Sequence, residues 1–231
     1  IIGAEHITWL LDWSDRNTAV LFGDGAGAVV LEKSNDYSDG EIYSFENGLS
    51  SENLEILEIP NMGSAMDRFE PDEAAKVRWT FDGQEIFKSG VRAMAKASAA
   101  AIEKSGLKKE DIDIFIPHQA NLRIVEALEK KLGLPNATTI KKVHRYGNTS
   151  AASIPTALVD ALEEGEISGG ETAVFTAVGA GLTWGACVVR LGERITPIQT
   201  SDAKLPDFDG TATDTIRKAI QYQVPDAVDK I

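Results

Sequence analysis

Three histidines are the side chains of this sequence that exchange a proton readily near neutral pH. His118 stands out because it follows an apolar run, residues 112–116, and Pro117, and precedes a helical pattern. In open α/β sheets, ligands bind at the carboxyl ends of strands. The place of His118 in the sequence therefore predicts a side chain that contacts a ligand.

The segment 144–153 holds two further polar candidates, His144 and Asn148. A loop histidine is more often a surface or capping residue than a catalyst, and we interpret His144 in that way. Asn148 comes just before a helical pattern, where asparagine is a preferred N-cap. Capping alone would explain Asn148 without any activity.

Metal, thiolate and dinucleotide chemistry find little support in the sequence. Three separated histidines and one cysteine offer no zinc-ligand spacing, so no metal is expected. Cys187 lies in the apolar run 184–189, which we interpret as a buried strand where cysteine acts as a small hydrophobe. The glycine-rich segment 23–27 is followed by a strand-like run instead of a helix, which disfavours a dinucleotide loop.

The elements that must position these residues alternate between strand and helix, which argues for an α/β sheet covered by helices. Helices are expected where apolar residues recur at three- and four-residue steps, and strands where short β-branched runs lie between turn residues. The expected helices are 84–104, ending before Gly106, then 120–132 and 149–164; the expected strands are 112–116, 172–178 and 183–191, with a hairpin of 18–22 and 28–31.

Three other stretches set the organisation of the chain. Residues 35–75 carry eleven acidic side chains and one basic one, and are expected to form a surface excursion with short strands. The apolar opening Ile1-Ile2 resembles the middle of a buried strand, so we expect a longer parent polypeptide. Residues 193–231 are polar, with one weak helix at 214–221, and are expected to form an extension to a unit that spans 1–192.

Composition excludes several classes of partner. The chain has 231 residues and a formal net charge of −13, which repels nucleic-acid phosphates. Residues 172–189 lack charge, but their glycines and β-branched residues favour two strands over a membrane span. A single cysteine gives no internal disulfide, and a cytoplasmic protein is expected.

Four segments, in order, resemble the signatures of the β-ketoacyl-acyl carrier protein synthase III family. The resemblance extends from Ile1 to about Leu191. It implies a thiolase-like fold of two similar α/β halves in α-β-α-β-α layers, of which this chain would be mainly the second half. The segments are PHQANLR at 117–123, GNTSAAS at 147–153, GAGLTWG at 179–185, and DR at 15–16 followed by FGDGAGA at 22–28.

The resemblance implies a shared role for His118 and Asn148 in a decarboxylative Claisen condensation. Both would donate hydrogen bonds to the thioester oxygen of a malonyl-derived enolate, an arrangement of the oxyanion-hole type. The backbone N–H of Ala180, between Gly179 and Gly181, would form a second oxyanion hole. The substrates implied are an acyl-CoA primer and malonyl-acyl carrier protein, with no resident cofactor.

Charge and resemblance together point to a carrier-protein surface. Residues 103–145 hold nine Lys or Arg and six acidic residues, a local excess of positive charge that suits an acidic carrier protein. A solvated helix face is the alternative. The resemblance implies docking on Lys88, Arg123, Lys130 and Lys131, a pocket wall at Phe87, and Trp9 where some relatives place an arginine against the coenzyme A adenine.

The family's nucleophilic cysteine belongs to the first half of the fold, and nothing in this sequence replaces it. The catalytic interpretation therefore needs the N-terminal half, as a separate or cleaved chain, in what the resemblance implies is a homodimer. Two alternatives stay open: a related acyltransferase with another acyl donor, and a non-catalytic subunit that binds a carrier protein or completes a dimer.

Overall fold

The computed structural model describes residues 1–52, 54–59, 79–196, 201–204, 207 and 209–223. The acidic stretch beyond Ile59 and the tail prolines at 197, 206 and 225 lie outside these residues. The strands are β1 (Ile2–Glu5), β2 (Gly25–Ala28), β3 (Gly40–Leu49), β4 (Leu57–Glu58), β5 (Thr80–Phe81), β6 (Ile114–Pro117), β7 (Thr138–Thr139), β8 (Thr172–Gly179) and β9 (Thr183–Leu191).

The helices alternate with these strands along the chain. The α-helices are α2 (Gly83–Ser105), α3 (Leu122–Leu132), α4 (Val143–Tyr146), α5 (Ser153–Glu163) and α6 (Ala212–Gln223); the 3₁₀ turns are η1 (Ile7–Leu10), η2 (Tyr37–Asp39), η3 (Leu54–Ile56), η5 (Lys109–Asp111) and η6 (Ser150–Ala152). The predicted helices 84–104 and 120–132 and both terminal strands are confirmed, with bounds shifted by a few residues. The weak helix expected at 214–221 is present as α6.

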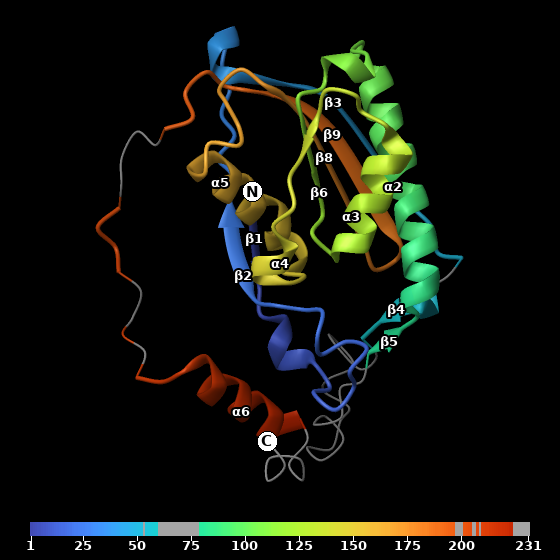
Figure 1. Ribbon diagram of the computed structural model, residues 1–231, viewed down its shortest axis with the longest axis vertical. Coiled ribbons are helices and arrows are strands. Elements are labelled where there is room, and N and C mark those ends of the chain that lie inside the picture. Colours follow the sequence, from blue (N-terminus) through green and yellow to red (C-terminus); the bar gives the residue numbers. More distant parts are fainter. Residues whose placement is uncertain (53, 60–78, 197–200, 205–206, 208, 224–231) are drawn as a thin grey trace.

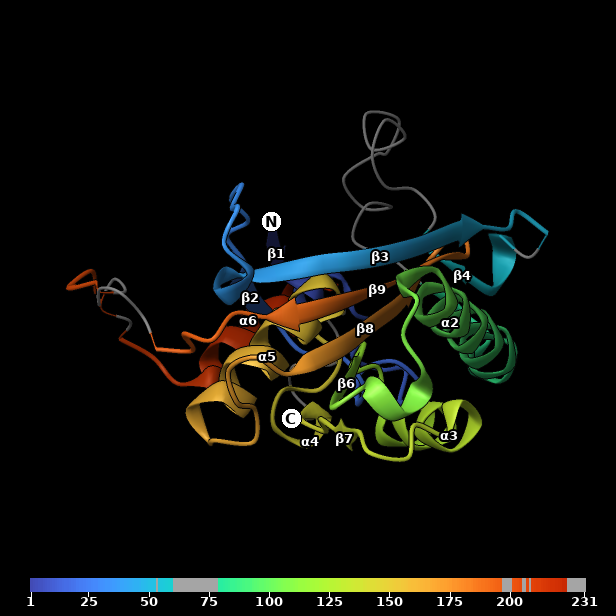
Figure 2. The same ribbon diagram turned by 90° about the horizontal axis from the view of Figure 1, so that it is seen from above.

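The main sheet has five strands in the order β3-β9-β8-β6-β7, with β6 parallel to both β7 and β8. Helices α2 and α3 cover one face and α5 covers the other (Figures 1 and 2). Alternating side chains of β6 supply both faces: Phe115 joins the core under α2 and α3, whereas Ile114 and Ile116 pack with α5. Because successive side chains of a strand point to opposite faces, one strand contributes to the core on each side of the sheet. The prediction of an α/β sheet covered by helices is confirmed.

The acidic stretch differs from the expected surface excursion in its first part. Residues 40–49 form the ten-residue strand β3, which pairs antiparallel with β9 along its whole length. One side of β3 faces α2, and Phe45 on the strand is 68% exposed. Of the two glutamates of β3, Glu41 is exposed, and Glu46 pairs with Lys104 of α2.

The glycine-rich hairpin prediction is wrong. Residues 25–28 are themselves the strand β2, which pairs with β1 rather than turning between two neighbouring strands. A Cβ on Gly27 would lie 2.8 Å from the Pro155 side chain. Gly27 therefore lets β2 pack closely against α5. In the sequence, glycines that allow such close packing look the same as glycines that form a turn.

The opening residues also differ from expectation. Residues 2–5 are a strand, as predicted, but Ile1 and Ile2 are 79% and 77% exposed. Helix α6, in the polar extension, contacts η1, and its residue Ile220 is buried. None of the helices in the described part of the chain combines the length and apolar character needed to cross a membrane.

Candidate active site

One cavity of about 460 Å³ collects the carboxyl end of β6, the turn between β8 and β9, and the start of α2. His118, Asn148, Gly179 and Ala180 all line it. These residues come from three segments far apart in the sequence, so the structure brings the main candidates together in one place. Gly181 lies between the lining residues Ala180 and Leu182.

His118 is held deep in this site. Its backbone N–H donates to the Thr176 carbonyl at 2.7 Å, which fixes the loop after β6 against β8. Its Nδ1 lies 2.6 Å from the Ser153 hydroxyl. Burial lowers the pKa of His118 from 6.5 to about 4, so the ring is neutral at physiological pH and carries one N–H.

This shift predicts a dependence of stability on pH. The folded pKa lies below the unfolded value, so the contribution is present above pH 6.5 and is lost as pH falls towards 4. We expect the wild type to lose, over that range, on the order of 2 kcal/mol more unfolding free energy than His118→Gln. Urea titrations at several pH values measure it. His144→Gln, at an exposed position, should keep the wild-type slope, and equal slopes for His118→Gln and wild type would contradict the burial argument.

Asn148 is fixed by both its backbone and its side chain. Its N–H donates to the Leu21 carbonyl at 2.8 Å, and its carbonyl accepts from the Gly23 N–H at 3.0 Å. Its side-chain Oδ1 accepts from the Ser150 N–H at 2.9 Å. Because the oxygen is engaged in this turn, the amide Nδ2 remains as the donor of Asn148. The expected cap is thus a turn into η6, and α5 itself begins later, at Ser153.

The contact between the Asn148 segment and residues 21–23 requires glycine. A Cβ on Gly23 would lie 2.1 Å from the Tyr146 carbonyl oxygen, which is backbone and cannot rotate away. We therefore expect Gly23→Ala to lower the free energy of unfolding by about 2 kcal/mol. Gly185→Ala is the matched control, since its Cβ would meet the Glu46 carbonyl oxygen at an ordinary 3.6 Å. Urea unfolding of both variants tests this; a Gly23→Ala protein as stable as wild type would refute the close contact.

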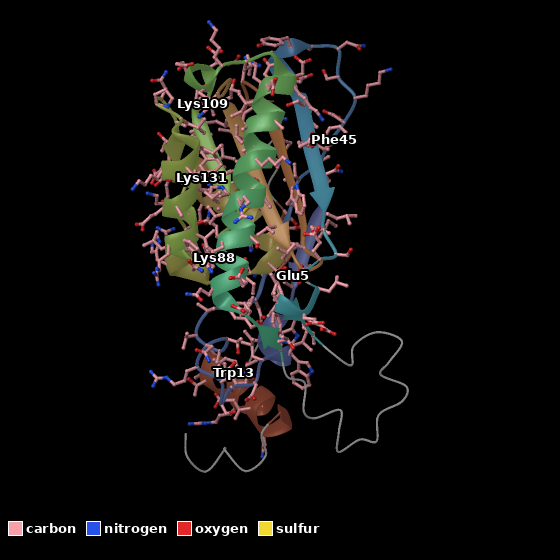
Figure 3. All side chains as sticks on the ribbon, turned by 90° about the vertical axis from the view of Figure 1, so that its right-hand side faces the viewer. Glu5, Trp13, Phe45, Lys88, Lys109 and Lys131 are labelled. Atoms are coloured by element: carbon pink, nitrogen blue, oxygen red, sulfur yellow. The ribbon has the colours of Figure 1, made fainter. Side chains whose placement is uncertain are left out.

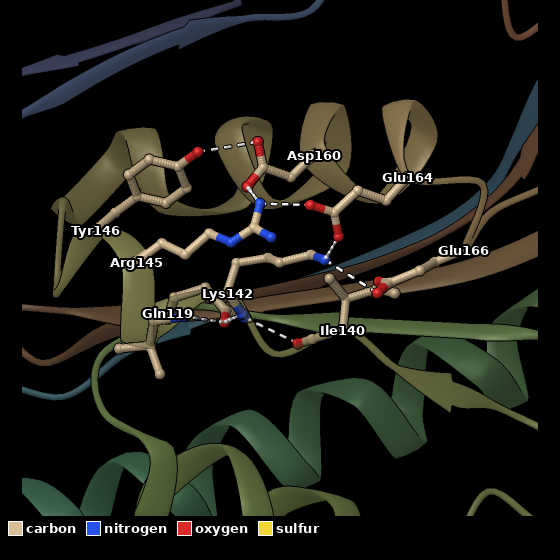
Figure 4. Close-up of polar contacts among 9 residues, drawn as sticks. Gln119, Ile140, Lys142, Arg145, Tyr146, Asp160, Glu164 and Glu166 are labelled. Atoms are coloured by element: carbon tan, nitrogen blue, oxygen red, sulfur yellow. Dashed lines mark hydrogen bonds and ion pairs between the residues drawn. The ribbon is translucent and has the colours of Figure 1, made fainter.

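Gln119 links the two donor segments from within the protein. It is 2% exposed, and its Nε2 donates to the Pro117 carbonyl at 2.6 Å and the Ile140 carbonyl at 3.2 Å. Its Oε1 accepts from the backbone N–H groups of Lys142 at 2.8 Å and Val143 at 3.2 Å. The side chain next to His118 therefore anchors the start of α4, which leads to Asn148 (Figure 4).

Ion pairs also attach the α4 segment to α5 and to the loop after it (Figure 4). Lys142 Nζ, almost fully buried, pairs with Glu164 at 2.6 Å and Glu166 at 3.1 Å. Burial alone would lower the pKa of Lys142, but the hydrogen bonds to these two carboxylates outweigh it and raise the pKa. Arg145 pairs with Glu164 and with Asp160. This cluster ties α4 to the end of α5 and to the loop that follows it.

Several residues that line the cavity were missed in the sequence. The Phe22 ring contacts the Trp79 ring at a tilt of 51°, with ring centroids 4.8 Å apart, and contacts Phe81 edge-on. The alternation of Trp79 and Phe81 just before the helix could have indicated this wall. Phe87, the expected pocket wall, packs against the hydrophobic core, and its neighbour Ile86 lines the cavity.

The expected docking residues lie outside the cavity. Lys88, Arg123, Lys130 and Lys131 are exposed on α2 and α3, and Lys88 pairs with Glu85 at 2.7 Å. Figure 3 shows Lys88 and Lys131 on these two neighbouring helices. Trp9 lies on η1 and is 37% exposed. In the described part of the chain, no three acidic, histidine or cysteine side chains gather as they would to hold a metal ion.

Two family models match this chain, and one of them covers His118, Asn148 and Ala180. The model described as 3-oxoacyl-[acyl-carrier-protein (ACP)] synthase III C terminal matches residues 102–191, and the 3-oxoacyl-[acyl-carrier-protein (ACP)] synthase III model matches residues 1–49. The chain belongs to the 3-oxoacyl-[acyl-carrier-protein] synthase III family. This finding confirms the resemblance inferred from the four sequence segments.

Individual synthase III relatives support the same placement. The chain is 48% identical over 227 residues to a β-ketoacyl-[acyl-carrier-protein] synthase III 2 of Vibrio cholerae, covering 96% of this chain and 60% of the relative. It is 43% identical over 193 residues to a β-ketoacyl-[acyl-carrier-protein] synthase III of Listeria monocytogenes, covering 84% of this chain and 57% of the relative. The chain thus spans about 60% of the length of these curated relatives, and corresponds to their C-terminal portion.

Solved synthase III structures share the fold. A 3-oxoacyl-[acyl-carrier-protein] synthase III from Aquifex aeolicus VF5 matches with a TM-score of 0.70 and 41% identity, over 82% of this chain and 56% of that one. A Pseudomonas aeruginosa PAO1 enzyme matches with a TM-score of 0.74 and 33% identity, over 85% and 58%. The architecture is therefore the C-terminal part of a thiolase-like fold, as expected.

Proposed function

We propose that this chain supplies the enolate-stabilising half of a synthase III that condenses an acyl-CoA primer with malonyl-acyl carrier protein. The observation that carries the proposal is the shared cavity, where a neutral buried histidine offers one ring N–H and an asparagine with an engaged Oδ1 offers its NH₂ group. Two fixed donors in a water-poor site stabilise negative charge that develops on a thioester oxygen.

The proposed chemistry proceeds in two steps at this site. Loss of CO₂ from the malonyl group leaves its electron pair as an enolate, whose oxygen accepts from His118 and Asn148. The enolate carbon then attacks the acyl group held as a thioester on a cysteine, and the thiolate leaves. The Ala180 N–H would stabilise the tetrahedral oxyanion of that second step, since Ala180 lines the same cavity.

The cysteine that carries the acyl group is assigned to the portion of the relatives that this chain does not span. Cys187, the one cysteine here, lies in β9, and burial raises the pKa of its thiol. A raised pKa disfavours the thiolate that nucleophilic attack requires. Homodimerisation and a cytoplasmic location stay predictions.

The test of this function uses the purified protein with any companion polypeptide. Intact mass after incubation with an acyl-CoA identifies an acylated cysteine, and a condensation assay with malonyl-acyl carrier protein measures CO₂ release and 3-oxoacyl product. We expect both. Carrier-protein binding without an acyl-enzyme or CO₂ release would instead favour the non-catalytic subunit.

The basic face of α3 supports docking of the acidic carrier protein. Asn121 and Ile124, in the first turn region of α3, line the cavity, and Arg123 lies between them on the exposed side. A carrier protein bound to Arg123, Lys130 and Lys131 would therefore deliver its thioester close to the cavity. Opposite charges on the two surfaces would accelerate their encounter.

Reversing this charge should distinguish the two substrates. We expect Arg123→Glu with Lys131→Glu to lower kcat/KM for the carrier-protein substrate about 10-fold at low salt, while acyl-CoA use changes little. Steady-state rates with each substrate varied in turn measure the difference. Lys33→Glu, an exposed reversal in the stretch between β2 and β3, is the control. An equal loss of kcat/KM for the carrier-protein substrate and for acyl-CoA would refute the proposal that these residues dock the carrier protein.

A further inference from the structure

The Ser153 hydroxyl contacts Nδ1, one of the two ring nitrogens of His118. Ser153 Oγ lies 2.6 Å from His118 Nδ1, and the two residues are 2% and 8% exposed. A contact this short and this buried orders both groups, because neither has bulk water as an alternative partner. Ser153 is the first residue of α5, so the rigid helix holds the hydroxyl in place.

The neighbouring hydrogen bonds indicate which atom donates. The backbone N–H of Gln119 donates to the same Ser153 oxygen at 3.3 Å, which occupies one of its lone pairs. A backbone N–H cannot accept, so Gln119 offers no place for the serine hydrogen. Among the described residues, His118 Nδ1 is the acceptor recorded within hydrogen-bond distance of that hydroxyl.

We propose that Ser153 is a positioning residue, which donates its hydroxyl hydrogen to His118 Nδ1 and so holds the ring hydrogen on Nε2. In a neutral imidazole one nitrogen donates and the other accepts, and the partner of one decides the state of the other. With Nδ1 accepting from Ser153, Nε2 carries the hydrogen for the cavity that the ring lines. The functional meaning of this hydrogen rests on the proposed function, in which Nε2 donates to the enolate oxygen.

The second donor is oriented by the same short segment. The Ser150 N–H donates to Asn148 Oδ1 at 2.9 Å, and Ser150 adopts a left-handed backbone conformation with φ of 49°. A non-glycine residue in this conformation is uncommon, and such residues gather at functional sites. Residues 150–153, at the entrance to α5, therefore engage both Asn148 Oδ1 and His118 Nδ1.

The decisive measurement is the protonation of the two His118 ring nitrogens, read from ¹⁵N chemical shifts of histidine-labelled protein. The spectrum of His118→Gln assigns the His118 signals among the three histidines. We expect a protonated Nε2 and an unprotonated Nδ1 in the wild type. In Ser153→Ala we expect a mixture of the two tautomers, and a fall in malonyl-thioester decarboxylation of about 10-fold.

Two further variants separate positioning from general damage. Ser153→Thr keeps the hydroxyl and should keep the wild-type tautomer. Ser98→Ala removes another fully buried serine hydroxyl, one that donates to the Met94 carbonyl in α2, and should change neither tautomer nor rate.

The spectra and the rates give separable outcomes. A protonated Nδ1 in the wild type, or an unchanged tautomer in folded Ser153→Ala, would overturn the role of Ser153 whatever the activity. A Ser153-dependent tautomer in a protein that does not decarboxylate malonyl thioesters would support the positioning role and refute the proposed function. The wild-type spectrum alone tests the proposal if Ser153→Ala does not fold.

Discussion

His118→Ala and Asn148→Ala should each slow malonyl-thioester decarboxylation about 10²–10³-fold in the complete synthase. Each change removes one of the two N–H donors that line the shared cavity, while the remaining donor stays fixed by its own hydrogen bonds. The loss falls on the step in which charge appears on the thioester oxygen, so kcat should fall more than KM rises. Release of CO₂ from malonyl-acyl carrier protein measures it.

Acyl transfer to the cysteine should persist in both variants, because that step forms no malonyl enolate. Intact-mass detection of the acylated protein checks this independence. His144→Ala is the control: His144 is exposed on α4 and outside the cavity, so its rates should match wild type. Wild-type decarboxylation in either donor variant would refute the proposed roles of His118 and Asn148.

The double variant adds information on how the two donors cooperate. Donors that act on one oxygen are expected to be non-additive, since the second removal acts on a site already impaired. A double variant about as slow as the slower single variant would indicate that the two form one unit. Fully multiplicative losses would indicate two independent contributions.

Elements with strong periodicity and explicit end signals were predictable from the sequence. The helix α2 repeats its apolar residues at three- and four-residue steps and ends at Gly106, whose φ of 76° is the left-handed conformation that favours glycine. The strands β8 and β9 follow from β-branched runs around a glycine turn. In these elements local propensity and tertiary packing favour the same structure, and such elements can be predicted from the sequence.

The failures share a physical origin in packing between distant segments. The glycines at 25 and 27 resemble a turn, but Gly25 serves the close approach of β2 to Thr149 and η6, and Gly27 serves its approach to α5, more than a hundred residues away in sequence. The strand β3 could not be recognised in the acidic stretch, because its partly exposed residues give no continuous apolar run. The residue pattern of one segment does not show which distant segment packs against it.

The candidate site was predictable in its parts and not in its connections. Short motifs placed His118, Asn148 and Ala180, and the structure shows that one cavity joins them. The hydrogen bonds that orient the donors come from Ser150 and Ser153, and the tie between the donor segments comes from Gln119. These contacts depend on three-dimensional geometry that spacing along the chain does not reveal.

Gln119→Leu should lower the free energy of unfolding by about 4 kcal/mol. The leucine has a similar volume but cannot accept from the N–H groups of Lys142 and Val143, which the Gln119 side chain satisfies in the wild type. Lys142 is 4% exposed, so water does not readily replace the lost acceptor. Urea unfolding measures the change. Gln84→Leu, at an exposed position in α2, should alter stability by less than about 0.5 kcal/mol.

The same variant also tests whether Gln119 transmits order from the His118 loop to the Asn148 segment. In folded Gln119→Leu the ion pairs of Lys142 and Arg145 still hold α4 to α5, so the fold persists while the direct tie is gone. Decarboxylation should then fall further than acyl transfer, because only decarboxylation uses both donors together. A variant that is less stable but has wild-type decarboxylation would show that the ion pairs alone position Asn148, and Gln119 would then contribute to stability without contributing to the geometry of the donors.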